Sequence, residues 1–184
     1  MRVSVLTATL PHRTEMLAEA RDSVKAQTAK DVRHLVGVDN AREGAGAVLN
    51  DLLQMVAGEW VMVLDDDDLL DPMHIDVALA ASEGVDVVYT MPRVTGGTFT
   101  NYEVPFNPQL LAAGFNCVSH TALMRTEMVR KVGGWRDVRS FDLDLFCRLE
   151  QAGAEFRQVP EVTWTYRLHG SNWSHGTLEE AAPL

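Results

Sequence analysis

The chain has 184 residues, of which 46 % are hydrophobic and 23 % charged, and this composition is ordinary for a soluble protein of one domain. Its formal net charge of −10, without a compensating cluster of lysine and arginine, argues against a general nucleic-acid or membrane-surface binder. The two cysteines, Cys117 and Cys147, lie far apart, which excludes a disulfide framework and a CxxC zinc site.

The first half of the chain alternates apolar stretches with amphipathic ones. The apolar stretches, which we expect to be strands, are Arg2–Ala8, His34–Asp39, Trp60–Leu64 and Asp86–Met91. The amphipathic stretches, which we expect to be helices, begin at Thr14, run through Val48 to Val56, and begin again at Asp71-Pro72. Strands that alternate with short helices build parallel sheets, so we expect an α/β fold with a Rossmann-like, mostly parallel sheet flanked by helices.

The second half of the chain is less regular and predicts a smaller, antiparallel portion. Pro92 to Pro108 contains Gly96-Gly97 and predicts a hairpin or mobile loop. The other expected elements are a strand at Ser119–Met124, helices at Thr126–Val132 and Asp142–Ala152, and strands at Phe156–Val159 and Val162–Tyr166. The tail from Gly176 is expected to be frayed.

The apolar runs of the sequence are all short. None approaches the ~20 residues of a membrane-spanning helix, and the first expected strand begins at Arg2, which leaves no room for a signal peptide. We therefore expect a cytoplasmic protein without a membrane span, in which both cysteines are reduced.

Four consecutive carboxylates, Asp65 to Asp68, directly follow the apolar run Trp60–Leu64. A nearly continuous apolar run predicts a buried strand, and open α/β sheets bind ligands at the carboxyl ends of such strands. Adjacent carboxylates repel one another unless a cation neutralises them, and Mg²⁺ and Mn²⁺ prefer oxygen ligands. The run therefore predicts a divalent cation that also holds the phosphates of a ligand.

Other interpretations of this acidic run are a solvated loop, an EF-hand and a phosphatase site. A solvated loop is the common state of an acidic run in isolation. An EF-hand fits poorly, because Leu70 stands where a loop beginning at Asp65 would need glycine. A haloacid-dehalogenase-like phosphatase would use an aspartate as its nucleophile, normally after the first strand, which here ends in Thr7-Ala8-Thr9.

Two further aspartates stand at the ends of expected elements, Asp39 after the second strand and Asp142 at the start of a late helix. With VSVLTAT and DSVKAQT near the start, and GGW, SFDLDLFCRL and YRLHGSNWS near the end, this order resembles the family-2 glycosyltransferases of the GT-A fold. The resemblance covers Arg2 to about Ser174. Each motif alone is weak evidence for this family, but the occurrence of all of them in this order is specific to it.

The resemblance implies an inverting enzyme that moves a sugar from a nucleotide diphosphate-sugar to an acceptor hydroxyl, with Mn²⁺ or Mg²⁺ as cofactor. It implies one domain over residues 1–184, with a nucleotide-sugar-binding half at 1–92, an acceptor and catalytic half at 93–175, and a tail at 176–184. The nucleotide, the sugar, the oligomeric state and the acceptor, whether glycan, protein or small molecule, stay open. A non-catalytic nucleotide-sugar binder on the same fold is the alternative.

By the same resemblance, the residues that contact the nucleotide are Thr7, Ala8, Thr9, Arg13, Asp39 and Asn50. Asp39 would bind the nucleobase, and the loop after the first strand, with Arg13, would line the base and the diphosphate. Asn50 matches an asparagine common in relatives, and its alternative is a polar helix residue.

The metal site is implied by the family pattern LDSDD, which aligns with Leu64 to Asp68. By that alignment Asp65 and Asp66 lie near the ribose and the metal, and Asp67 is the direct metal ligand. His169 either completes the metal shell or contacts the diphosphate, unless it is structural. Two other positions are ambiguous: Arg167 is an anion partner or a surface residue, and His120 is a core or acceptor-pocket residue rather than a ligand.

The general base is expected to be Asp142, which matches the aspartate of the family's Glu-Asp motif. Phe141 replaces the preceding glutamate, and this departure leaves the contacts of the base undefined. Asp144 is the competing choice, but a helical step of about 100° per residue turns it to a different face. Asp142 could instead cap its helix, and Trp135 could either stack on a sugar or pack in the core.

Overall fold

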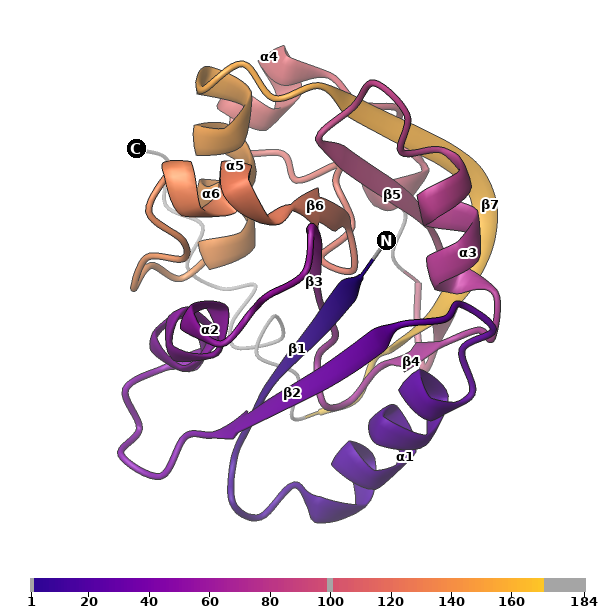
Figure 1. Cartoon of the computed structure of the whole chain (residues 1–184), viewed down its shortest axis with the longest axis vertical. Helices are drawn as coiled ribbons and strands as arrows, with labels where there is room; N and C mark the ends of the chain where they lie inside the picture. The colour runs from indigo at the N-terminus through magenta and orange to yellow at the C-terminus, as the bar shows by residue number, and fades with distance from the viewer. Residues whose placement is uncertain (1, 99–100, 171–184) are drawn as a thin grey trace.

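A single mixed sheet runs through the computed structural model, which describes residues 2–98 and 101–170 (Figure 1). Its strands lie in the order β2 (Val32–Val38), β1 (Val3–Thr9), β3 (Trp60–Val63), β6 (Leu123–Arg125), β5 (Val87–Thr95), β7 (Phe156–Arg167) and β4 (Leu69–Leu70). β1 is parallel to β2 and β3, and β5 is parallel to β7. Only β6 and β4 run against their neighbours, so the expected mostly parallel α/β sheet is confirmed.

The helices cover both faces of this sheet. They are α1 (Thr14–Lys25), α2 (Ala45–Gln54), α3 (His74–Ala80), α4 (Pro108–Ala112), α5 (Thr126–Lys131) and α6 (Phe141–Gln151). Alternate residues of β3 point to opposite faces, so Val61 and Val63 pack with α2, α5 and α6, whereas Trp60 and Met62 pack with α1 and α3. The four residues of β3 are all buried, as its continuous apolar run predicted.

Several boundaries differ from the expected ones for local reasons. α3 begins at His74 instead of Asp71-Pro72, because the residues before it form a turn. The expected strand at Ser119–Met124 is shortened to β6, because residues 119–122 form a turn closed by the Ala122 amide, which donates to the Ser119 carbonyl oxygen at 3.0 Å. The two residues of β4 follow the acidic run and pair with β7, a pairing that no local pattern in the sequence indicates.

The expected loop from Pro92 to Pro108 is partly regular. Its first residues extend β5 to Thr95, a 3-10 turn spans Asn101–Glu103, and α4 begins at Pro108, where the side chain of Asn107 accepts two backbone N–H groups. The two short strands expected near the end are one strand, β7, whose register against β5 shifts near Met91. The tail from Gly176 lies outside the described residues.

Among the helices of the described residues, none has both the length and the apolar character that a bilayer-spanning segment needs.

His34 on β2 and Thr7 on β1 form a partly buried polar link beside the central strand. The Thr7 hydroxyl donates its single proton to the Leu64 carbonyl oxygen at 2.7 Å, so His34 Nε2, 2.9 Å away, must be the donor to Thr7 Oγ1. Burial, together with Arg21 and Lys25, lowers the pKa of His34 to about 4. His34 is therefore a neutral donor at neutral pH.

This histidine predicts a pH-dependent term in stability. Between about pH 6.5 and 4 the unfolded chain binds a proton at this position that the folded chain does not, so acidification through this range removes stability. His34→Gln keeps a donor for Thr7 but cannot titrate. Between pH 7 and pH 4.5 we therefore expect its free energy of unfolding to fall by about 2 to 3 kcal/mol less than that of wild type.

Urea unfolding of both proteins at each pH measures this difference. The comparison must be made pairwise, because carboxylates elsewhere in the chain titrate over the same range. The exposed residue His12 supplies the control His12→Gln. Parallel loss of stability in wild type and His34→Gln would contradict the assignment.

Candidate active site

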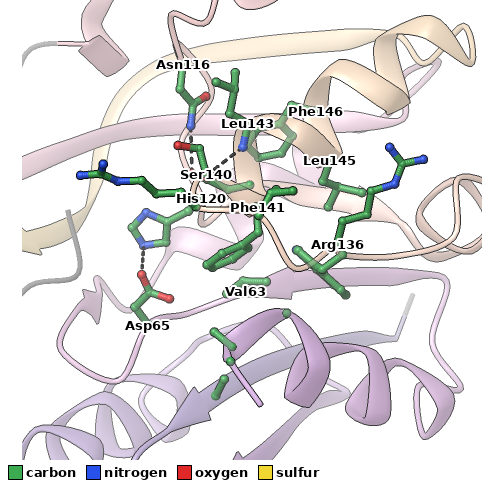
Figure 2. Close-up of a pocket in the computed structure, with 18 of the residues that line it drawn as sticks. Val63, Asp65, Asn116, His120, Arg136, Ser140, Phe141, Leu143, Leu145 and Phe146 are labelled. Carbon is green, nitrogen blue, oxygen red and sulfur yellow. Dashed lines mark hydrogen bonds and ion pairs between the residues drawn. The ribbon is translucent and has the colours of Figure 1, made fainter. Parts of the chain in front are cut away.

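A cleft with a cavity volume of about 530 Å³ lies where β1, β2 and β3 end and α6 begins. Eleven of the residues singled out in the sequence line it: Ala8, Thr9, Arg13, Asp39, Asp65, Asp66, Asp67, His120, Trp135, Phe141 and Asp142. In Figure 2, Asn116, His120 and Asp65 follow one another along one side of this pocket, and Phe141 points into it. The carboxyl ends of the parallel strands thus meet the start of α6 across one cavity.

Of the residues assigned to the nucleotide or the metal, Thr7, Asn50 and His169 lie outside the lining formed by the described residues. Thr7 is fully buried in the link to His34. Asn50 holds the Gly-Gly-Trp turn, since its Nδ2 donates to the Trp135 carbonyl oxygen at 2.7 Å and its Oδ1 accepts the Trp135 amide at 2.9 Å. Gly134 has a φ of +69° there, and a Cβ would lie 2.2 Å from Asn50 Oδ1, so only glycine fits.

Asp39 organises the loop that leads into α2. Its backbone amide donates to the Thr9 carbonyl oxygen at 2.8 Å, which continues the β1–β2 pairing. Its carboxylate accepts the backbone amides of Glu43 and Gly44, each at 2.9 Å. Gly44 has a φ of +93°, a conformation that glycine adopts without strain. The carboxylate is therefore preoriented at the cleft wall by backbone donors.

Asp66 and Asp67 form an ion-paired cluster with Arg13. The Thr9 hydroxyl and the Arg13 guanidinium donate to the two oxygens of Asp66, and burial nevertheless raises the pKa of this carboxyl. Asp67 Oδ2 lies 3.2 Å from the Arg13 guanidinium and 3.1 Å from His169 Nε2. The two residues assigned to the metal by resemblance, Asp67 and His169, are thus in contact.

Asp68 and Arg167 tie the acidic run to the end of β7. Asp68 is fully buried and accepts the Arg167 backbone amide at 2.9 Å. The Arg167 side chain donates to the Asp67 carbonyl oxygen and forms an ion pair with Glu19 on α1. Arg167 therefore fastens the strand to the loop and to a helix, a role that neither of its expected interpretations included.

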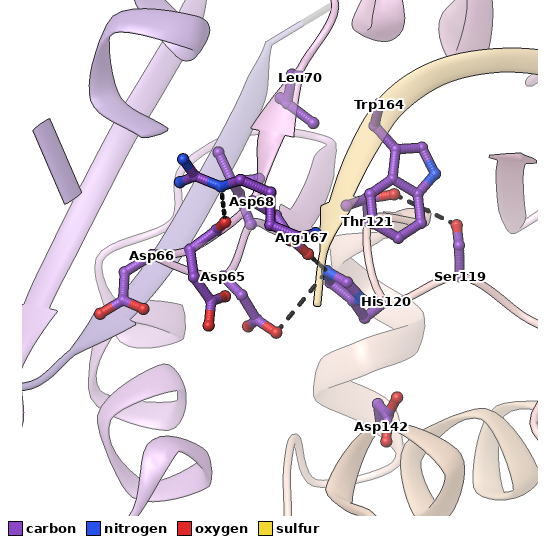
Figure 3. A network of polar contacts seen from close by, with 12 residues as sticks. Asp65, Asp66, Asp68, Leu70, Ser119, His120, Thr121, Asp142, Trp164 and Arg167 are labelled. Atoms are coloured by element: carbon purple, nitrogen blue, oxygen red, sulfur yellow. Dashed lines mark hydrogen bonds and ion pairs between the residues drawn. The ribbon is translucent and has the colours of Figure 1, made fainter. Parts of the chain in front are cut away.

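His120 brings a cationic group to the acidic run from the turn before β6. Its Nε2 lies 3.0 Å from Asp68 Oδ2 and 3.8 Å from Asp65 Oδ2 (Figure 3). Its ring packs edge-on against Trp164, with ring centroids 4.8 Å apart. Burial alone would lower the pKa of His120, but Asp65 and Asp68 outweigh this effect and raise it. The imidazolium therefore balances part of the charge of the acidic run, and its Nε2 can act as a metal ligand only after losing the proton.

The donor atoms in this part of the cleft suit a hard divalent cation. Asp65, Asp68 and His120 each offer one ligand atom, and these atoms all lie within 4.8 Å of one another. The side chain of Asp65 is 48 % exposed, which leaves it open to the cleft. Mn²⁺ binds both carboxylate oxygens and imidazole nitrogens, whereas Mg²⁺ prefers the carboxylate oxygens of such a donor set.

Asp142 lies in the first turn of α6 and faces the cleft. Its Oδ2 accepts the side-chain amide of Asn116 at 2.9 Å, and its Oδ1 accepts the Leu143 backbone amide at 2.8 Å. Ser140 occupies the N-cap position, so Asp142 is not the cap residue of this helix. Figure 3 shows Asp142 on the opposite side of the open space from Asp65.

Asp144 lies in the same helical turn but is engaged elsewhere. Its Oδ2 accepts two donors of the Arg148 guanidinium, at 2.8 and 2.6 Å, and its Oδ1 lies 3.6 Å from Arg136. Within the described residues it is not part of the cleft lining. The helical step that separates Asp142 from Asp144 thus directs one carboxylate into the cavity and the other to a salt bridge.

Comparison with known proteins agrees with this arrangement. A family model described as "Glycosyltransferase like family 2" matches residues 1–177. A curated relative, the uncharacterized protein y4gI of Sinorhizobium fredii (strain NBRC 101917 / NGR234), is 26 % identical over 150 residues, which are 76 % of this chain and 16 % of that protein. This chain therefore spans about a sixth of that relative.

Solved structures share the fold at low sequence identity. TarS 1-349 of S. aureus in complex with UDP-GlcNAc has a TM-score of 0.76 at 15 % identity, over 97 % of this chain and 62 % of that chain. The mannosyltransferase PcManGT from Pyrobaculum calidifontis, in complex with GDP-Man and Mn²⁺, has a TM-score of 0.68 at 18 % identity, over 94 % and 58 %. These likenesses establish the fold, and this chain spans about 60 % of either protein chain.

Proposed function

The chain belongs to the glycosyltransferase-like family 2, and from this premise we propose that it is a metal-dependent inverting transferase, which moves a sugar from a nucleotide diphosphate-sugar to an acceptor hydroxyl. One observation carries the proposal: a single cleft is lined by Asp39, by Asp65 to Asp67 and by Asp142. A donor nucleotide, its diphosphate and an acceptor oxygen can therefore meet in one cavity. TarS and PcManGT, which have the same fold, were solved with UDP-GlcNAc and with GDP-Man and Mn²⁺, which supports the class of donor.

The donor end of the cleft is assigned to Asp39 and the loop after β1. Two backbone amides already orient the carboxylate of Asp39, so little conformational entropy would be lost when it accepts a nucleobase N–H. Ala8 and Thr9 leave room beside it, and Arg13 is positioned to contact the diphosphate. Because Arg13 is already paired with Asp66 and Asp67, its charge alone does not neutralise a diphosphate.

Additional positive charge is therefore needed at the acidic run. Asp67 and His169 are the proposed ligands of a divalent cation, and Asp65, Asp68 and His120 form a second donor set beside them. Such a cation, when bound, stabilises the negative charge that develops on the diphosphate as the bond to the sugar breaks. Held by these residues, such a cation would lie near the carboxyl end of β3, after which the acidic run begins.

Asp142 is the proposed general base at the acceptor end. As the acceptor oxygen bonds to the anomeric carbon, the bond from that carbon to the diphosphate breaks, and its electron pair leaves with the diphosphate. The acceptor proton moves to the carboxylate of Asp142. Attack from the face opposite the diphosphate inverts the anomeric configuration. Asp144 is not assigned this role, because its carboxylate is held by Arg148.

Release of nucleoside diphosphate tests the proposal. The 184-residue chain is incubated with Mn²⁺ and a panel of UDP-, GDP- and dTDP-sugars, with water or added sugars as acceptor. We expect release from at least one donor, lost on addition of a chelator and restored by excess Mn²⁺. The absence of release from every donor, together with no thermal stabilisation by any of the nucleotides, would contradict the proposed function.

A further inference from the structure

Asn116 makes an unassigned contact to the proposed base. It lies in the loop between α4 and β6 and lines the cleft, and nothing in the sequence singled it out. Its side-chain Nδ2 is 2.9 Å from Asp142 Oδ2, and its Oδ1 is 3.1 Å from the backbone nitrogen of Val118. Both polar atoms of this amide are therefore used.

The chemistry of the second contact determines which way the amide faces. A backbone N–H can only donate, so the group next to the Val118 nitrogen must be the carbonyl oxygen of Asn116. The NH₂ group then necessarily points at Asp142. Asn116 is thus a fixed donor to this carboxylate, and the loop backbone sets its direction.

Three features act together on Asp142. Asn116 donates to one carboxylate oxygen, and the Leu143 amide donates to the other. The position in the first turn of α6 also favours negative charge, because the helix dipole is positive there. Each carboxylate oxygen has two lone pairs, so one on each remains available for the proton of an acceptor hydroxyl.

On these contacts, we propose that Asn116 is a positioning residue, which holds the carboxylate of Asp142 in one rotamer, ready to accept a proton. The inference rests on the proposed function, because it assigns Asp142 as the base. A base held in one geometry loses less entropy in the transition state. Asn116 itself does not take part in proton transfer.

Asn116→Asp separates positioning from a merely structural role. An aspartate at this position still offers an oxygen to the Val118 amide, so a residue needed only for the loop would leave the turnover unchanged. The donor to Asp142 is replaced by a second negative charge, so positioning predicts a fall in kcat of about 10- to 100-fold, with the KM for the sugar donor unchanged. Gln109→Glu makes the same chemical change on an exposed residue of α4 and is the matched control.

A charge swap provides a readout that does not depend on activity. Asn116→Asp alone places two carboxylates face to face, and we expect Tm to fall by about 2 to 6 °C. In the double variant Asn116→Asp with Asp142→Asn, the amide again faces a carboxylate, and most of the lost Tm is expected to return while kcat does not. Failure of the double variant to recover Tm would contradict the contact.

UDP-GlcNAc and GDP-Man with Mn²⁺ are the probes, and released nucleoside diphosphate is measured. If Asp142→Asn is inactive but Asn116→Asp turns over like wild type, the positioning role is wrong and the proposed function stands. If wild type releases nucleotide and Asp142→Asn releases it equally fast, the assignment of the base fails, and the inference fails with it. Release by wild type and Gln109→Glu, with slow release by Asn116→Asp at unchanged KM, supports the inference.

Discussion

Asp142→Asn is expected to lower the transfer rate by about 10²- to 10⁴-fold, which is the usual contribution of a general base. The amide has the size of the carboxylate but cannot accept the acceptor's proton. Asp142 contacts Asn116 and Leu143 rather than the donor end of the cleft, so the affinity for the nucleotide should not change. Stopped-flow or coupled assays of nucleotide release measure the rate, and calorimetric titration with UDP or GDP in the presence of Mn²⁺ measures the binding.

The neighbouring carboxylate supplies a matched control for this prediction. Asp144→Asn makes the same substitution two residues further along α6, where the side chain is bound by Arg148. We expect its turnover to stay within a few-fold of wild type, with some loss of stability because the salt bridge is weakened. The reverse pattern, in which Asp144→Asn is inactive and Asp142→Asn is active, would assign the base to Asp144.

Asp67→Ala is expected to abolish metal-dependent nucleotide binding, with a loss of affinity of at least 10- to 100-fold in the presence of Mn²⁺. Removing this carboxylate removes a proposed direct ligand and leaves His169 without its 3.1 Å partner oxygen. Arg13 keeps its pair with Asp66, so the loop after β1 retains its main anchor. Calorimetry with UDP and GDP, with and without Mn²⁺, measures the effect.

The two donor sets of the acidic run give different outcomes for this experiment. If Asp67→Ala binds Mn²⁺ and nucleotide like wild type while Asp65→Ala does not, the cation is held by Asp65, Asp68 and His120 instead. Asp22→Ala removes a carboxylate of α1 whose side chain is 73 % exposed, and it is the control for a general loss of negative charge. Unfolding curves of each variant separate lost ligands from lost structure.

The strands and helices of the first half of the chain were predictable because their signals are local. The run Trp60–Leu64 is apolar throughout, which requires burial on both faces of a sheet, and β3 shows this. Leu17, Ala20 and Val24 recur at the helical period and are the buried residues of α1. Shorter elements were predicted less well, because β4 and β6 owe their existence to pairing with distant strands.

The residues that complete the candidate site could not be predicted from the sequence. Asn116 stands in a stretch of turns without periodicity, and nothing in the sequence singled it out. His120 was expected to be a core or acceptor-pocket residue rather than a ligand, and the expected strand at Ser119–Met124 gave no indication of its contact with Asp68. Their significance comes from the chain path, which brings the loop between α4 and β6 over the carboxyl ends of the central strands. A polar residue in a loop carries no signal of the partner that it will meet.

The sequence by itself determined the α/β alternation, the acidic run after a buried strand, and the order of motifs that identifies the family, because burial and hydrophobic period are properties of neighbouring residues. Only the tertiary structure decided that Asp142 rather than Asp144 faces the cleft. It also placed Asn50 and Thr7 outside the cleft lining formed by the described residues, where they support the fold. Finally, it brought Asn116 to the carboxylate of Asp142 and His120 to that of Asp68. These outcomes depend on contacts between residues far apart in the chain. The geometry of such contacts follows from the packing of all the elements together.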